Sequence, residues 1–183
     1  AITPTDKLYM RTGVLETCWK RIPWLMLLML SAAFTGSIIT SFESALAKQV
    51  VLTAFIPMLM GTGGNGGGQS SVVVIRGISL DEIEFSDIFK VLWKEFRIAI
   101  VCGVILAGVN FVKMLWLDQT TILVAAVVSI TLVVTLICAK VLGCILPMLA
   151  KRAGFDPAVM ASPFITTVVD AVSLFTYFSV ATL

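Results

Sequence analysis

The sequence predicts an all-α membrane protein with five transmembrane helices in each chain, and two observations carry that prediction. Hydrophobic residues make up 58% of the 183 residues and charged residues only 13%, whereas soluble domains average roughly 45–50% and about 25%. Five stretches also stay apolar over about 20 residues, the length at which a helix crosses the bilayer core. A chain of this length suits one compact membrane domain.

The five expected helices are divided by short polar stretches. In chain order they cover residues 22–47, 50–77, 96–117, 121–150 and 157–183. A short polar helix over 5–20 is expected before the first of them. An amphipathic helix over 81–95 is expected to link the second and third, with Glu95 at the membrane surface. Residues 1–21 then form a cytoplasmic segment, and residues 22–183 form the membrane domain.

The distribution of Lys and Arg predicts the orientation. Ten of these residues flank the expected helices on one side, and two, Lys48 and Lys113, flank them on the other. Cytoplasmic flanks of membrane proteins carry the excess of Lys and Arg. The N-terminus is therefore expected in the cytoplasm and the C-terminus outside.

The second expected helix contains the run IPMLMGTGGNGGGQSS, residues 56–71. Pro57 lacks an amide proton and glycine is a poor helix former, which favours a broken or kinked helix. Unwound backbone is tolerated at membrane depth where it lines water, so Asn65 and Gln69 are candidates to line a pore. Close helix packing through the glycines is the alternative, and the two can hold together.

The fifth expected helix contains a carboxylate, Asp170, near its middle. A charge at the centre of a spanning helix costs about 2.5 kcal/mol or more on insertion scales, so it usually faces a wet cavity or a partner. Helical spacing places Pro163, Thr166, Thr167 and Ser173 on the same broad face as Asp170. Further candidates to line a pore are Ser162, Pro163, Thr167 and Ser173. The alternative is a structural ion pair between Asp170 and Lys140.

These side chains offer only oxygen ligands. His is absent, and carboxylate, hydroxyl and amide oxygens suit Mg²⁺, Ca²⁺ or Mn²⁺. One chain supplies one carboxylate here, and a two-fold dimer would supply two around a shared axis. Glu43 is a candidate for an outer mouth or for a pair with Lys48. Asp156 precedes Pro157, so it suits a helix N-cap, and its position also allows an inner ion site.

Two stretches resemble the membrane domain of the MgtE magnesium channels. They are PMLMGTGGNGGGQSSVVVIRG, residues 57–77, and DPAVMASPFITTVVDAVSLFTYFSVA, residues 156–181, and the likeness extends from about residue 8 to residue 183. The resemblance implies a homodimer in a bacterial cytoplasmic membrane, with a pore on the two-fold axis lined by the second and fifth helices. It implies that Asp170 and the Thr166 carbonyl hold a hydrated Mg²⁺ through water. It also implies that Asp156 takes part in a cytoplasmic site tied to gating.

The resemblance extends to domain organisation. Family members carry cytoplasmic N-terminal and CBS domains that sense Mg²⁺ and act through a connecting plug helix. The 183 residues contain no counterpart of those domains, and residues 1–21 resemble the end of the plug helix. The chain is thus expected to be either a truncated form or a member without the regulator. Ser162 stands where the family often has Gly.

The leading hypothesis is a Mg²⁺ channel driven by the membrane potential. The alternative is a secondary transporter that exchanges H⁺ or Na⁺ for a divalent cation such as Mg²⁺, Mn²⁺ or Co²⁺. A third hypothesis, a membrane anchor that transports nothing, would make Asp170 structural. We expect no enzymatic activity, because no nucleophile–base pair can be identified. The net charge of +2 gives no indication of a nucleic-acid partner.

Overall fold

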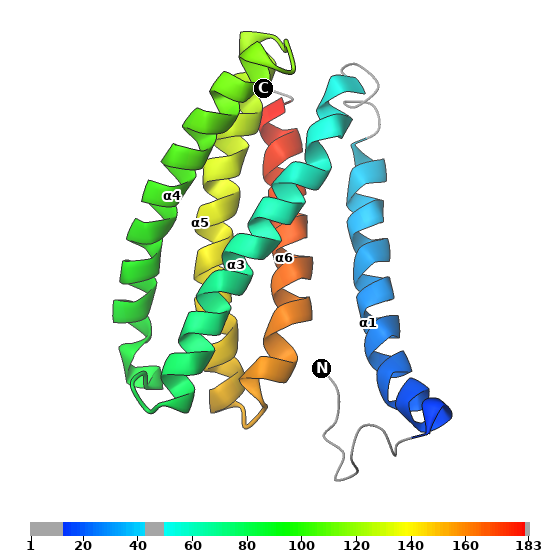
Figure 1. Ribbon diagram of the computed structural model, residues 1–183, viewed down its shortest axis with the longest axis vertical. Coiled ribbons are helices and arrows are strands. Elements are labelled where there is room, and N and C mark those ends of the chain that lie inside the picture. Colours follow the sequence, from blue (N-terminus) through cyan, green and yellow to red (C-terminus); the bar gives the residue numbers. More distant parts are fainter. Residues whose placement is uncertain (1–12, 43–49, 182–183) are drawn as a thin grey trace.

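The computed structural model describes residues 13–42 and 50–181, except for the side chains of residues 158–164. Within these ranges every regular element is helical, and five long helices occur (Figure 1). They are α1 (Val14–Ser41), α3 (Ile56–Ser79), α4 (Ile88–Trp116), α5 (Ile122–Arg152) and α6 (Pro157–Ala181), with the short 3-10 helices η2 (Val50–Phe55) and η3 (Phe85–Asp87) between them. The all-helical prediction and the order of the five helices are confirmed.

Three of the described segments are long and apolar enough to cross a membrane: Val14–Ser41, Phe85–Trp116 and Ile122–Arg152. Ile165–Ala181 adds a shorter apolar stretch within α6. The glycine-rich helix α3 is not among them, because its many glycine and polar residues lower its hydropathy. This composition fits a membrane protein in which α3 packs within the bundle.

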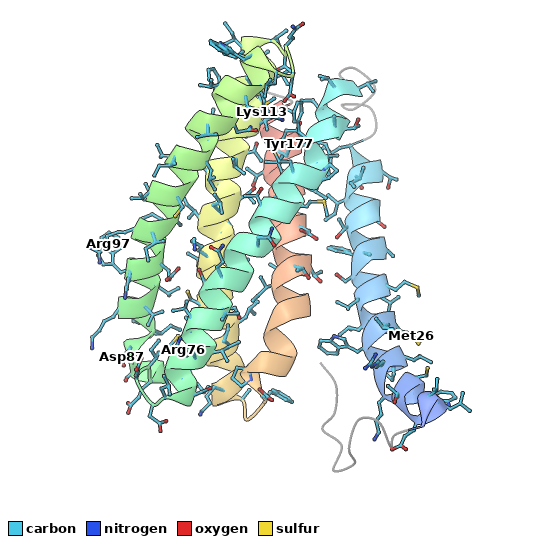
Figure 2. All side chains as sticks on the ribbon, in the orientation of Figure 1. Met26, Arg76, Asp87, Arg97, Lys113 and Tyr177 are labelled. Atoms are coloured by element: carbon cyan, nitrogen blue, oxygen red, sulfur yellow. The ribbon has the colours of Figure 1, made fainter. Side chains whose placement is uncertain are left out.

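Helix α5 lies at the centre of the bundle and packs against α3, α4 and α6 (Figure 1). Helix α6 also contacts α3 and α1. The first half of α1, which carries Met26, stands apart from the other helices (Figure 2). Near its end α1 rejoins them, where the Phe42 ring stacks on Phe178 with the ring centroids 4.8 Å apart.

Two expected boundaries were wrong. Helix α1 begins at Val14 and continues through Pro23 without interruption, so no separate polar helix ends at residue 20; residues 5–12 of that expected helix lie outside the described part. The expected linker helix over 81–95 is also absent. The chain instead turns after α3 through Asp81, which has a φ of 54°, and α4 starts at Ile88. The second half of the expected linker therefore belongs to the long third span.

The predicted break in the second span is not found, because α3 is continuous from Ile56 to Ser79. Pro57 lies in the first turn of α3, where its missing amide proton costs no helical hydrogen bond. The glycines instead allow close packing. A Cβ built on Gly67 would lie 2.7 Å from Cγ2 of Ile165 in α6 and 3.0 Å from the carbonyl oxygen of Ala139 in α5. The packing alternative thus accounts for Gly63, Gly66 and Gly67, which lie where a side chain would collide.

Candidate functional site

The glycine-rich helix α3 has a packed face and an open face. Gly63, Gly66 and Gly67 are buried against α5 and α6. Gly61 and Gly68 have no atom of another element within 4 Å of a built Cβ. Asn65 and Gln69 are exposed in the single chain. Close packing on one side of α3 therefore directs these two amide side chains to the other side.

Asp170 is half-buried in the middle of α6. The preceding residue, Val169, is fully buried, and so is Ile165 one turn earlier, where it packs with Ala139 of α5. Asp170 therefore borders the buried side of α6, which packs on α5. Its own side chain remains partly exposed in the single chain. Among the residues that the structure describes, none forms an ion pair or a hydrogen bond with its carboxylate.

Two threonines lie shortly before Asp170 in α6. Thr166 lies close to α3, and Thr167 contacts α1. Thr166 is one turn before Asp170, and its Cγ2 atom would lie 3.8 Å from a Cβ built on Gly64, next to Asn65. The Thr167 hydroxyl contacts the Ser31 hydroxyl of α1. We use the name open face for two neighbouring groups of residues: the exposed Asn65 and Gln69 of α3, and the half-buried Thr166 and Asp170 of α6.

Ser173 does not share the open face. It is 1% exposed, and its hydroxyl donates to the carbonyl of Val169 at 2.6 Å. Its Oγ would lie 3.5 Å from a Cβ built on Gly63, on the packed side of α3. The structure thus places this predicted pore-lining residue inside the protomer.

Lys140 pairs with a residue that the sequence pattern had assigned to the membrane surface. Its Nζ atom lies 3.8 Å from Oε2 of Glu95 in α4 and donates to Ser70 Oγ of α3 at 3.2 Å. Ser70 Oγ donates to the same Glu95 oxygen at 2.7 Å. The alternative pair between Lys140 and Asp170 is therefore wrong, and so is the surface position expected for Glu95, which is 9% exposed.

The remaining candidate residues are not brought together at Asp170. Asp156 is exposed immediately before Pro157, the first residue of α6. Glu43 lies outside the described residues, and Ser162 and Pro163 fall in the stretch of α6 whose side chains are not described.

A hollow lies between the end of α3 and the end of α5, away from the open face. It is lined by Ile78, Asp81, Ile83, Glu84, Phe85, Met148 and Lys151.

The open face offers a cation few protein ligands. The described residues contain no group of three or more Asp, Glu, Cys or His that could hold a metal ion. One carboxylate with amides and hydroxyls nearby suits a hard cation that keeps most of its water, as Mg²⁺ does in proteins. The open face of one chain therefore suits contact with a hydrated cation rather than a closed metal cage.

The family model described as MgtE, divalent cation transporter, matches residues 56–180. The chain is also similar to curated proteins named magnesium transporter MgtE. It is 40% identical to the one from Bacillus subtilis (strain 168) over 175 residues, which is 93% of this chain and 38% of that protein. It is 33% identical to the one from Thermus thermophilus over 183 residues, 100% of this chain and 40% of that protein. It is 31% identical to the one from Enterococcus faecalis over 92% of this chain and 37% of that protein. The chain thus spans about two fifths of the length of these relatives.

Proposed function

The chain belongs to the MgtE family of divalent cation transporters, and we propose that two copies of it form a pore that conducts Mg²⁺ across the bacterial cytoplasmic membrane. The three relatives are named magnesium transporters. The N-terminus then lies in the cytoplasm and the C-terminus outside. The observation that carries the proposal is the half-buried Asp170 carboxylate, which has no ion-pair partner among the described residues.

Two copies are needed because each chain contributes one carboxylate to the open face. A two-fold axis beside α3 and α6 would bring the two Asp170 side chains to one path, and a C2 interface uses the same surface of both copies. The dimer would also cover the exposed amide groups of Asn65 and Gln69. These polar groups would then line a wet path instead of meeting lipid, where each unsatisfied group costs several kcal/mol.

The ion at Asp170 is proposed to stay hydrated. Mg²⁺ sheds its water reluctantly and is commonly held by one or two carboxylates with several waters. The Asp170 carboxylates and the Thr166 carbonyls accept hydrogen bonds from the water shell, and Asn65, Gln69 and Thr167 contribute further polar groups along the path. Asp156 is exposed at the proposed cytoplasmic end of α6 and is assigned an inner ion site. Glu43 is assigned to the outer mouth on its sequence position alone.

The membrane potential can drive this flow without a second substrate. It contributes about 2.3 kcal/mol per elementary charge per 100 mV, and hence about 4.6 kcal/mol for a divalent cation. The test is Mg²⁺ uptake by proteoliposomes that contain the full chain, with the potential set by a potassium gradient and an ionophore, and with no H⁺ or Na⁺ gradient. We expect uptake that rises with the inside-negative potential. Uptake that requires an opposing H⁺ or Na⁺ gradient would instead establish exchange.

A further inference from the structure

Ser70 of α3, Glu95 of α4 and Lys140 of α5 form a buried cluster, the three-helix triad. These side chains are 2%, 9% and 5% exposed. Among the described charged residues only Glu95 and Lys140 are buried. No sequence pattern predicted the triad, and the open face described above does not include it.

The three members depend on one another. The Lys140 ammonium donates to the Ser70 hydroxyl, and that hydroxyl donates to the Glu95 carboxylate. A buried charge without its partner is far more costly than the pair. The triad as a whole has no net charge, because the carboxylate balances the ammonium.

The triad lies next to the open face along α3. Ser70 directly follows Gln69, and it points to the packed side of the helix while Gln69 points to the open side. Lys140 follows Ala139, which packs against Ile165 of α6, one turn before Val169 and Asp170. An unbalanced charge at Lys140 would therefore act on a cation held at Asp170 through little water.

We propose that the three-helix triad is a charge-balanced positioning site for the ion path. Glu95 cancels the Lys140 cation inside the membrane, and Ser70 joins the balanced pair to the helix that carries Asn65 and Gln69. Asp170 then remains the carboxylate that sets the field felt by the cation. Glu95 and Lys140 are positioning residues, since neither lies on the open face. This inference rests on the proposed function.

The test compares the apparent Mg²⁺ affinity of Glu95→Gln and Lys140→Met in the full chain. Affinity is measured twice, as the half-saturating Mg²⁺ concentration for flux and as that for thermal stabilisation in detergent. Glu95→Gln leaves an unpaired ammonium, so the half-saturating concentration should rise by about threefold or more at an effective dielectric constant of about 20. Lys140→Met leaves an unpaired carboxylate, so the concentration should fall. The double variant should return close to wild type.

Shifts of opposite sign are the signature of charge balance. A scaffold role would reduce the stability of both single variants, with their affinities unchanged or shifted the same way, and either result would overturn the inference. If Glu95→Gln fails to fold, Lys140→Met and the double variant still differ by the Glu95 charge alone. Asp87→Asn and Lys90→Gln are the matched controls. Asp87 and Lys90 form an ion pair of 2.8 Å in which Lys90 is 83% exposed, so solvent screening should leave the affinity unchanged.

The two readouts also separate this inference from the proposed function. If the wild type conducts Mg²⁺ but the half-saturating concentrations of the two single variants do not shift in opposite directions, only the charge-balance inference is overturned. The half-saturating Mg²⁺ concentration for thermal stabilisation could shift in opposite directions in the two single variants while the wild type shows no flux. That result would overturn the conducting pore and support charge balance. An absence of any Mg²⁺ effect in either readout would overturn both.

Discussion

Gly143 of α5 lies against the backbone of Gly67 in α3. A Cβ built on Gly143 would come 3.1 Å from the Gly67 Cα atom and closer still to its carbonyl oxygen. Backbone atoms cannot move aside as the tip of a flexible side chain can. This contact therefore fixes how closely α3 approaches the central helix, and with it the position of Asn65 and Gln69 on the open face.

Gly143→Ala should destabilise the protein, because the added methyl group has to push α3 and α5 apart. Overpacking of a well-packed interior typically costs about 1–3 kcal/mol. The measurement is thermal unfolding of the purified protein in detergent. The matched control is Gly108→Ala in α4, since Gly108 also lies in a helix but a built Cβ there has nothing within 4 Å. That control should be neutral or up to about 1 kcal/mol stabilising, because alanine favours helix. Equal melting temperatures for the two variants would contradict the packing account.

Tyr177→Phe should loosen the end of the bundle at which α6 meets η2. The Tyr177 hydroxyl donates to the carbonyl of Leu52 at 3.0 Å, which links α6 to η2, and the ring is fully buried. Removing the hydroxyl removes this hydrogen bond, at a cost of about 0.5–1.5 kcal/mol. Thermal unfolding provides the measurement, with Phe175→Leu as the control because Phe175 is 63% exposed on the same helix. An unchanged melting temperature for Tyr177→Phe would show that the hydroxyl adds nothing to stability.

A cysteine at position 69 should make Mg²⁺ flux sensitive to a positively charged thiol reagent. Gln69 is exposed on the open face, and a reagent bound there would place positive charge in the proposed path. The four native cysteines are first replaced, since Cys18 is exposed. Val104→Cys in α4 is the matched control, because Val104 is 59% exposed on an apolar surface suited to lipid. Reagent-resistant flux in Gln69→Cys, or equal inhibition of the control, would place the path elsewhere.

The sequence predicted the number and order of the long helices because apolar stretches of about helical length alternate with short polar ones. It failed on the continuity of α3, because helix propensity is a weak prior that tertiary packing overrides. The regular spacing of Gly63, Gly67 and Ser71, all buried on one side of α3, could have indicated the packing. Small residues at every fourth position indicate a close helix contact more directly than they indicate a break.

The partner of Lys140 was missed for a different reason. Glu95 lies 21 residues before the end of α4 at Trp116, and Lys140 lies 18 residues after the start of α5 at Ile122. Two antiparallel helices joined by a short turn bring such residues to the same level. Counting outward from that turn would have brought them within one helical turn of each other, whereas the apolar pattern alone placed Glu95 in a surface linker. The rotation of each helix about its own axis decides which faces of α3, α5 and α6 meet. A pattern of single residues does not determine that rotation.

The central claim is that the Asp170 carboxylate holds the permeating cation. Its most direct test is Mg²⁺ flux into proteoliposomes at a fixed potential, comparing the wild type with Asp170→Asn at matched incorporation. Asn keeps the size of the side chain and removes its charge, and Asp170→Glu serves as the variant that restores the charge. Loss of a charge-assisted contact worth about 1.5–3 kcal/mol predicts at least about a tenfold fall in flux for Asp170→Asn, with partial recovery in Asp170→Glu. Equal flux in the wild type and Asp170→Asn, with both proteins folded, would contradict the account.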